Sequence, residues 1–442
     1  MGIVASIGLC SVLAFASEDR VALHLSFDGT GKATEGWKAG GKGKIHVKAV
    51  GSDPSGPASS RHLSIDAEPS TALQTKSIEL PDLSRCSDVE LRVRSSSATP
   101  SEPTVLEVQC FTPNHGWFWR RLDVRAGDEF TTVRLPLRWF RTSRDSVPRW
   151  NEVDAFGIWF RNGGTVEIDD IKWIDGGRAD AAERSLDEIA AEAFSTATEP
   201  KRAERRGVVV MTDDPALPAD AVLDAIDAMR AGVERDIPGH GSPWRPVVLL
   251  VFAQDADYRA FWPRFAARFA SDIEAPKSDG FTSAGIASAA AAPDGRLRPV
   301  FVHEATHAYL EQVLRLDHTQ NWLQEGLAVR YQAAFMGEDF GPTMRRRIAD
   351  PAKHPSLARL TDGRELRSTE YAQAGSFLEW LLDDPKRAEG LRKAIPAMVK
   401  ARSTALEPHA NAILGASLDE LEAQWMAWAT TRYALPQGDD AK

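Results

Sequence analysis

The stretch Val300–Gln312, VFVHEATHAYLEQ, decides how the second half of the chain is interpreted. Pro299 precedes it, and proline suits the first turn of a helix because an N–H there would have no partner. No further proline or glycine occurs up to Leu314, so the sequence predicts a helix that begins at Pro299. On that helix His303 and His307 lie on the same face, because residues four apart are neighbours on a helix surface.

The spacing H-E-x-x-H is the one that a zinc hydrolase needs. Two neutral imidazoles, those of His303 and His307, would converge on one Zn²⁺. Glu304 is rotated by one residue, so it can reach a water on the metal but is poorly placed as a ligand. The sequence therefore predicts His303 and His307 as metal ligands and Glu304 as the general base. The alternative is a chance spacing, and a third ligand nearby is needed to decide against it.

A candidate for the third ligand lies in NWLQEGLAVRYQAAF, residues Asn321–Phe335. Glu325 falls in the middle of this predicted helix, on a largely apolar side, where a carboxylate is costly to bury unless it is paired or bound to metal. Gly326 weakens a helix by about 1 kcal/mol relative to alanine, which is expected if two helices approach closely there. We predict Glu325 as the third zinc ligand; the alternative is an ordinary surface glutamate.

Taken together, H-E-x-x-H followed by W-L-x-E-G-L-A resembles the glutamate-zincin (gluzincin) metallopeptidases, and within them the peptidase-MA-like families. The resemblance covers residues 207–435, although the specific matches lie in the two predicted helices. It implies the zinc ligands His303, His307 and Glu325. It also implies Glu304 as catalytic base and Tyr371, in STEYAQAGSFLEWLL, as a hydrogen-bond donor to the oxyanion of the intermediate. The alternative for Tyr371 is a packing role with its hydroxyl in solvent.

The segment Gly280–Ala287, GFTSAGIA, is predicted to be an edge strand of small residues that precedes the zinc helix. In similar enzymes such a strand pairs with the substrate backbone, and small side chains permit that approach. Aminopeptidases of the group that the chain resembles carry a glutamate here, but this chain has no acid between Gly280 and Ala292. This absence favours an endopeptidase. The alternative is a plain edge strand or a loop.

The first part of the chain, residues 20–176, has the pattern of an all-β domain. Short β-type runs recur between turn residues, which is typical of a sandwich or jelly roll. The predicted strands are Val21–Phe27, Ser77–Leu80, Val89–Val93, Thr104–Cys110, Trp117–Val124, Thr131–Leu135, Ala155–Phe160 and Val166–Trp173.

The ends of this domain, HLSFDGTGKATEGW and GGTVEIDDIKWI, resemble those of galactose-binding-like carbohydrate-binding modules. Aromatic faces on an open strand surface stack on sugar rings, and the resemblance therefore implies a glycan site. The candidate residues are Trp117, Phe118, Trp119 and Trp139. The alternative is that these rings form the core of the sandwich.

Two further features of this domain concern ions and thiols. The resemblance implies that Asp28 and Asp170 hold a structural Ca²⁺. Cys86 and Cys110 either form a disulfide or remain buried thiols, and the sequence leaves both alternatives open.

The rest of the organisation follows from composition. With 442 residues the chain is long enough for several domains. Residues 1–16 have an apolar run ending in A-x-A, which predicts a signal peptide and a secreted or periplasmic (cell-envelope) protein; the alternative is an N-terminal anchor. Residues 177–206 are predicted to be a linker with a short helix, and residues 207–435 an α+β zincin-like domain.

Charge and hydropathy exclude some classes of partner. The net charge of −10 argues against nucleic acid. After the signal peptide no apolar run is long enough to predict an integral membrane span.

The sequence thus predicts a multidomain protein, an N-terminal all-β jelly-roll sandwich followed by an α+β zincin-like metallopeptidase domain. We expect an exported, zinc-dependent endopeptidase that acts on a protein or peptide and contacts carbohydrate or glycoprotein through its first domain. One alternative is a non-catalytic glycan- or surface-binding protein with a relic zincin domain. Another is a zinc hydrolase of non-peptide substrates.

Overall fold

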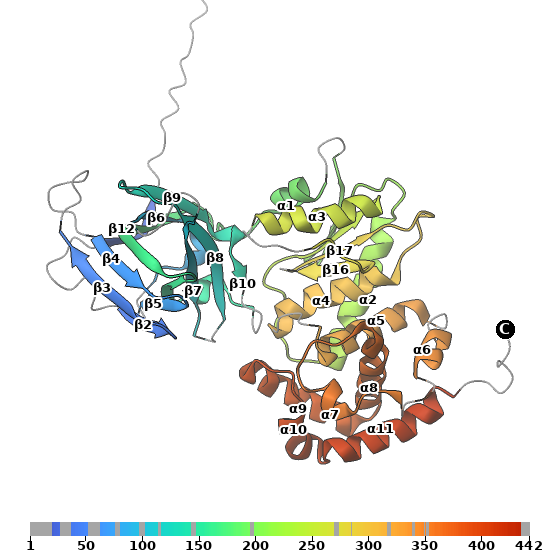
Figure 1. The fold of residues 1–442 in the computed structure, drawn as a ribbon. Coiled ribbons are helices and arrows are strands. Elements are labelled where there is room, and N and C mark those ends of the chain that lie inside the picture. The colour runs from blue at the N-terminus through green and yellow to red at the C-terminus, as the bar shows by residue number, and fades with distance from the viewer. Residues whose placement is uncertain are drawn as a thin grey trace, which may run out of the picture.

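The protein consists of an N-terminal β-sandwich and a C-terminal region in which helices surround a further sheet (Figure 1). This computed structural model describes residues 20–26, 37–51, 62–75, 80–96, 102–113, 116–142, 147–194, 199–268, 274–283, 285–315, 320–337, 341–348, 350 and 353–434. The predicted signal peptide and Asp28 lie outside these residues.

Two six-stranded sheets form the sandwich, as the alternating pattern predicts. Its strands are β1 (Val21–Ser26), β2 (Trp37–Gly41), β3 (Ile45–Val50), β4 (His62–Ala67), β5 (Thr71–Thr75), β6 (Cys86–Ser95), β7 (Thr104–Phe111), β8 (Trp117–Val124), β9 (Thr131–Pro136), β10 (Arg141–Thr142), β11 (Ala155–Phe160) and β12 (Gly164–Asp175). One sheet has the order β3-β4-β12-β6-β9 with β1 beside β12, and the other has the order β10-β8-β7-β11-β5-β2. Strands β2 to β5 and β10 were not predicted, and most of the predicted strand at 77–80 falls outside the described residues.

The inner faces of the two sheets enclose an aromatic core. Trp173 and Phe156 are fully buried, with ring centroids 5.1 Å apart. Phe118 also points inward and stacks on Trp150 at 3.7 Å. Because neighbouring residues of a strand face opposite sides, the inward position of Phe118 places its two tryptophan neighbours on the outer face of the sheet.

The C-terminal sheet has five strands, in the order β13-β14-β15-β17-β16. They are β13 (Lys201–Arg205), β14 (Val208–Thr212), β15 (Val247–Phe252), β16 (Gly280–Ser283) and β17 (Ile286–Ala290). The three central strands are parallel and fully buried, which explains why their sequences consist mostly of apolar residues.

Two expectations are corrected by this sheet. The segment predicted as one edge strand is an antiparallel pair, β16 and β17, and only β16 lies at the edge. The residues 177–206, predicted to be a linker, contain β13, which pairs with β14 and so belongs to the sheet. The short helix predicted in that segment is α1 (Leu186–Ala193).

Helices cover both faces of this sheet (Figure 1). Helix α1 and α3 (Asp255–Ala267) pack on one face, and α2 (Ala219–Asp236) and α4 (Pro299–Leu314) pack on the other. The remaining helices are α5 (Trp322–Met336), α6 (Gly341–Ile348), α7 (Leu357–Leu360), α8 (Tyr371–Asp383), α9 (Pro385–Ala401), α10 (Glu407–His409) and α11 (Leu418–Arg432). Among the described residues, no helix has the length and apolar character needed to cross a bilayer.

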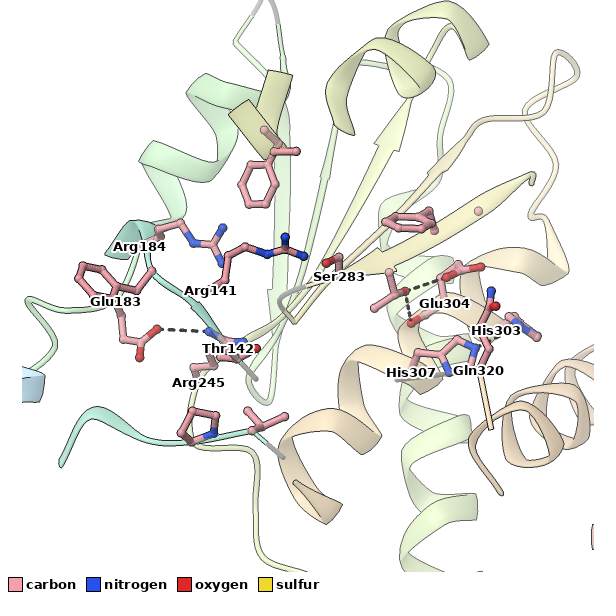
Figure 2. A pocket seen from close by; sticks show the side chains of 18 of the residues that line it. Arg141, Thr142, Glu183, Arg184, Arg245, Ser283, His303, Glu304, His307 and Gln320 are labelled. Carbon is pink, nitrogen blue, oxygen red and sulfur yellow. Dashed lines mark hydrogen bonds and ion pairs between the residues drawn. The ribbon is translucent and has the colours of Figure 1, made fainter. Parts of the chain in front are cut away.

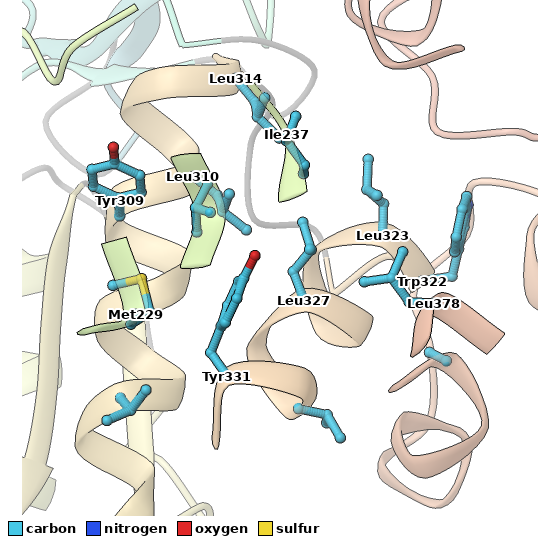
Figure 3. Close-up of a cluster of buried hydrophobic side chains, with 14 of the residues drawn as sticks. Met229, Ile237, Tyr309, Leu310, Leu314, Trp322, Leu323, Leu327, Tyr331 and Leu378 are labelled. Atoms are coloured by element: carbon cyan, nitrogen blue, oxygen red, sulfur yellow. The ribbon is translucent and has the colours of Figure 1, made fainter. Parts of the chain in front are cut away.

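Short helical turns connect these elements. They are η1 (Leu83–Arg85), η2 (Leu137–Trp139), η3 (Trp150–Glu152), η6 (Ser368–Glu370) and the π-helical turn η7 (Ala410–Leu414). The largest apolar cluster joins α2, α4, α5 and α8, and Figure 3 shows Met229, Leu310 and Tyr331 pointing into it. This cluster fixes α5 against α4, the two helices that carry the predicted metal ligands.

The sandwich is attached to the end of α4 by a charged contact. The guanidinium of Arg315 pairs with both carboxylate oxygens of Glu152, at 3.0 and 2.6 Å. It also donates to the carbonyl oxygen of Val147, whose own N–H donates to the carbonyl oxygen of Arg315 at 3.1 Å. The segment of the sandwich around η3 is therefore held beside the C-terminal end of α4.

Gly326 permits the close approach of α5 and α8, as the sequence predicts. A Cβ at this position would lie 2.9 Å from the carbonyl oxygen of Ala374 on α8. The new Cβ would be fixed to the backbone of α5, and the carbonyl oxygen of Ala374 belongs to the backbone of α8. Neither atom can therefore move aside unless the two packed helices separate.

We predict that Gly326→Ala lowers the free energy of unfolding by about 1–3 kcal/mol, since it overpacks a tight helix contact. This loss should outweigh the roughly 1 kcal/mol by which alanine is favoured over glycine in a helix. Urea denaturation followed by circular dichroism measures the change. Gly241→Ala is the control, because a Cβ there meets no atom within 4 Å. A Gly326 variant as stable as the Gly241 variant would contradict the packing argument.

Candidate metal centre

Helix α4 brings the two predicted histidine ligands together. Pro299 occupies its first turn, as predicted. The Nε2 atoms of His303 and His307 lie 3.3 Å apart, one helical turn from each other on the same face. Both side chains are largely buried, with exposed fractions of 13% and 6%. The two imidazoles thus point to a common position beside the helix.

Helix α5 adds the third predicted ligand, Glu325. Its carboxylate oxygen Oε2 lies 3.4 Å from Nε2 of His303 and 3.6 Å from Nε2 of His307. The sequence suggested that Glu325 lies in the middle of its helix, but it lies in the first turn. The reason is that α5 begins at Trp322, with Asn321 as its N-cap. The prediction that Glu325 faces inward is confirmed, since its side chain is only 2% exposed.

The environment keeps Glu325 ionised. Burial works against the charge, but the adjacent His307 and His303 hold the pKa of Glu325 well below its usual range. The helix N-terminus also favours a negative charge. Burial likewise opposes a charge on His303, but contact with Glu325 and the charge of Glu304 raise its pKa.

The three donor atoms fit a tetrahedral metal ion. They all lie within 4.8 Å of one another, and they form the one such cluster of histidine, cysteine or acidic residues among the residues that the structure describes. A tetrahedral zinc with bonds of about 2.0–2.1 Å holds its donor atoms about 3.3–3.4 Å apart, close to the separations of 3.3, 3.4 and 3.6 Å found here. Oε2 of Glu325 is buried with no hydrogen-bond donor of suitable geometry among the described residues, so a cation would satisfy it.

Gln332 orients the first histidine. Its Oε1 lies 3.0 Å from Nδ1 of His303 and can accept a hydrogen bond from Nδ1–H, an arrangement that would leave Nε2 to bind a metal ion. Such a second hydrogen bond normally fixes the tautomer of a metal-binding histidine. The sequence analysis missed Gln332, although it lies seven residues after Glu325, two turns along the same helix face.

The predicted base, Glu304, is buried beside strand β16. The hydroxyl of Thr282 donates to Oε2 of Glu304 at 2.7 Å, which restricts its rotation. Gly280 allows the strand to lie this close, because a Cβ there would come within 2.5 Å of the Glu304 side chain. No local pattern in the sequence indicates Thr282, since the contact depends on how the strand packs against α4.

Tyr371, at the start of α8, lies next to the predicted metal ligand His303. Its ring stacks near that of His303, with centroids 6.4 Å apart and planes 18° from parallel. Burial, followed by the charge of Glu325 and a hydrogen bond to it, raises the pKa of Tyr371 above its ordinary value. The phenol therefore stays protonated and remains a hydrogen-bond donor.

These residues open into a cavity of about 600 Å³ (Figure 2). Its lining includes the three predicted metal ligands, Glu304 and Tyr371 on one side. The other side is formed partly by the sandwich, through Arg141 and Trp150 among others. The predicted site is thus a cleft between the two parts of the protein.

The four aromatic residues predicted to stack on sugar have different positions. Trp117 and Trp119 lie half-buried on the outer face of β8, whereas Phe118 belongs to the core. Trp139 packs against Phe265 of α3, with ring centroids 6.0 Å apart, so it lies at the contact with the C-terminal region.

The structure decides between the two alternatives for the cysteines but does not test the predicted calcium site. Asp170 pairs with Lys172 at 3.3 Å, and its proposed partner Asp28 lies outside the described residues, so the calcium site stays a prediction. Cys86 and Cys110 are free, buried thiols. Burial, and then the charge of Asp175, raise the pKa of Cys86 to about 12, which makes it unreactive at neutral pH.

Comparisons with known proteins give likenesses to carbohydrate-binding modules. The family 11 module of a cellulosomal cellulase of Clostridium thermocellum is 17% identical over 32% of this chain and 87% of that one, with a TM-score of 0.25. The CBM22-1 xylan-binding domain of Paenibacillus barcinonensis is 11% identical over 38% of this chain and 97% of that one, with a TM-score of 0.26. An exo-β-agarase is 12% identical over 44% of this chain and 37% of that one, also with a TM-score of 0.26.

TM-scores this low do not establish a shared fold. The assignment of a β-sandwich rests on the strands and the core of this chain itself. No family model and no curated protein matches the chain. The resemblance to gluzincins therefore rests on the motif residues themselves.

We predict that Gln332→Leu weakens zinc binding about 10–100-fold, because His303 loses the acceptor that orients its ring. Competition with a chromophoric chelator measures the dissociation constant. Gln373→Leu is the control, because it removes another buried glutamine, whose amide donates to the carbonyl oxygen of Pro355. Unchanged affinity in the Gln332 variant would show that the ring is oriented by packing alone.

Proposed function

We propose that this protein is a zinc-dependent metallopeptidase that hydrolyses peptide bonds. The observation that carries the proposal is the convergence of His303, His307 and Glu325 at separations suited to tetrahedral zinc, beside the buried carboxylate of Glu304. Three protein ligands leave one position for water, which distinguishes a catalytic from a structural zinc site.

When bound by these three ligands, zinc would lower the pKa of a coordinated water and polarise the scissile carbonyl. Glu304 accepts the proton of the attacking water and later passes it to the leaving amine. Thr282 holds one oxygen of this carboxylate by its 2.7 Å hydrogen bond, so the base keeps one orientation during the transfer. The side chains of Glu304 and Glu325 are buried, and charge interactions are stronger there than in water.

Tyr371 supports the same reaction as a neutral donor. Its raised pKa keeps the phenol proton in place at neutral pH. During attack on the carbonyl, the hydroxyl can move from Glu325 to the developing oxyanion and stabilise its charge. The ring of Tyr371 lies beside that of His303, 6.4 Å between centroids, so the hydroxyl belongs to the same cluster of side chains.

Strand β16 is the proposed docking edge for the substrate backbone. It ends the C-terminal sheet, so its outer edge is not paired with another described strand of that sheet. A peptide added along this edge would run past Glu304, which contacts Thr282 of the strand. The absence of an acid from the sequences of β16 and β17 leaves no partner there for a substrate α-amine, which favours endopeptidase action.

We also propose that the protein is exported. This part rests on the apolar run and A-x-A site of residues 1–16.

The proposal predicts different effects for the base and a ligand. Glu304→Gln should retain zinc and lose peptide hydrolysis about 10²–10⁴-fold, because only the proton acceptor is removed. His303→Ala should lose the metal itself. Metal analysis of the purified protein and chelator-sensitive cleavage of casein or a peptide library provide the measurements.

Three results would redirect the proposal. A Gln variant with wild-type peptidase activity would remove Glu304 from its role. Stoichiometric zinc without cleavage of any peptide would favour a zinc hydrolase of non-peptide substrates. A wild-type protein that binds no zinc would favour a non-catalytic protein with a relic domain.

A second candidate function, glycan binding by the sandwich, is favoured by the outer face of its second sheet. Trp119 lies opposite Gln109 of β7, and the same row continues across β11 to Gln74 of β5. Trp119, Trp117 and Trp159 on this face are partly exposed. Several partly exposed aromatic rings on one sheet face suit a sugar ring, which offers an apolar face for stacking.

We predict that Trp119→Ala abolishes binding to any glycan that the intact protein retains, because the stacking ring is lost. A soluble-polysaccharide gel-shift panel is the measurement. Trp428→Ala, on α11, removes a partly exposed tryptophan remote from the sandwich and is the matched control. Failure of the wild-type protein to bind any glycan would end this candidate while leaving the peptidase proposal intact.

A further inference from the structure

The cavity that begins at the metal ligands ends against the sandwich. Its lining passes from His303 and Glu304 along β16 to Ser283, and then to Arg141 and Arg184 (Figure 2). Arg141 belongs to strand β10 of the sandwich, and Arg184 to the segment that joins the two parts of the protein. A substrate lying along β16 would therefore reach residues that lie outside the sheet and helices carrying the catalytic groups.

Charge is segregated along this cavity. Glu304, Glu325 and Glu365 line this cavity together with His303, His307 and Tyr371. The opposite end carries four guanidinium groups, which we call the arginine wall. The arginine wall consists of Arg138, Arg141, Arg184 and Arg245. Figure 2 shows Arg141, Arg184 and Arg245 grouped away from Glu304, with Ser283 between the two groups.

The arginine wall continues beyond the first cavity. A second hollow of about 580 Å³ shares Arg184, Arg245 and Trp244 with the first. It adds three more arginines to its lining, namely Arg149, Arg178 and Arg202. Three acids, Asp180, Glu183 and Asp187, line this hollow as well, so the arginines outnumber the acids there but do not stand alone.

The guanidinium groups of the wall are held in place by their surroundings. Arg184 lies over the rings of Phe265 and Trp139, with its Cζ 4.8 and 5.8 Å from the two centroids. Arg245 lies 4.7 Å over the ring of Trp244. A guanidinium that stacks on an aromatic ring is pre-organised, so little side-chain entropy is lost when it binds an anion.

Acidic neighbours offset part of this positive charge. Glu183 lies 3.3 Å from Arg245, which is also 3.6 Å from Glu311. Glu188 pairs with Arg138 at 2.8 Å. Even so, burial and the neighbouring Arg245 lower the pKa of Arg184 to about 10, which means that the surroundings disfavour its positive charge. An anion bound beside Arg184 would compensate for this cost.

We propose that the arginine wall binds a carboxylate of the substrate, so that the enzyme selects peptides bearing a negative charge on the sandwich side of the scissile bond. This inference rests on the proposed peptidase function and names its substrate class. Guanidinium groups match carboxylates because their N–H groups can bond both oxygens at once. The carboxylate is either an Asp or Glu side chain or the C-terminal carboxylate of a short peptide.

The test measures binding separately from cleavage. The full-length Glu304→Gln protein, loaded with zinc, is titrated with four fluorescent peptides of one sequence. They carry an internal Glu or Gln, each with a free or an amidated C-terminus. We expect the peptides with a carboxylate to bind about tenfold or more tightly than the neutral peptide, a preference that weakens with added salt. The internal and terminal arms identify which carboxylate is recognised.

Substitutions in the arginine wall test whether its residues cause the preference for peptides with a carboxylate. In the same Glu304→Gln background, Arg141→Gln should reduce the preference to about twofold or less without changing the affinity of the neutral peptide. Arg184→Lys keeps the buried charge but not the planar fork, so it tests the same point without removing a cation from the interior. Arg296→Gln, at an exposed position whose partner is Asp294, is the control. Circular dichroism and zinc content confirm that each variant is folded.

The outcomes separate the inference from the proposed function. Equal affinity for all four peptides, or a preference that survives both wall variants, overturns the inference even if the wild-type protein cleaves peptides. A carboxylate preference that the wall variants remove supports it. If that preference is found but the wild-type protein cleaves no peptide, the arginine wall stands as an anion site and the peptidase proposal fails.

Discussion

The burial of one carboxylate, that of Glu325, is the constraint on which the candidate site depends. An ionised carboxylate is stable inside a protein only if nearby cations or donors replace the water that it loses. Here the imidazoles of His303 and His307 face it from α4, and Gln332 fixes the ring of His303 from α5. The close contact of α5 with α8 keeps this arrangement out of solvent and brings Tyr371 beside it. A bound metal ion would complete a set of groups that already face one another.

The sandwich is more than an attached domain, because it contributes directly to the cleft. Arg315, which follows α4, is held by Glu152 and by the backbone at Val147. The same segment of the sandwich lines the cavity that starts at the metal ligands. The position of the sandwich is thus coupled to the helix that carries both histidines, and the arginine wall is assembled only when the two parts meet.

The sequence by itself determined the features that depend on local spacing. The four-residue interval of His303 and His307 places them on one helix face wherever the helix packs, and a glutamate on an apolar helix side indicates Glu325. The same reasoning could have found Gln332. It failed for β13, because an edge strand carries charged residues that protect it from pairing and so resembles a linker.

Tertiary structure alone decided the contacts between distant segments. Thr282 reaches Glu304 from another element, and the arginine wall gathers residues from a strand, a connecting segment and a turn. The periodicity of the sequence does not predict such contacts, because they depend on how whole helices and strands pack against one another. For that reason the convergence of His303, His307 and Glu325 could be predicted from the sequence, whereas the charge at the other end of the cleft required the fold.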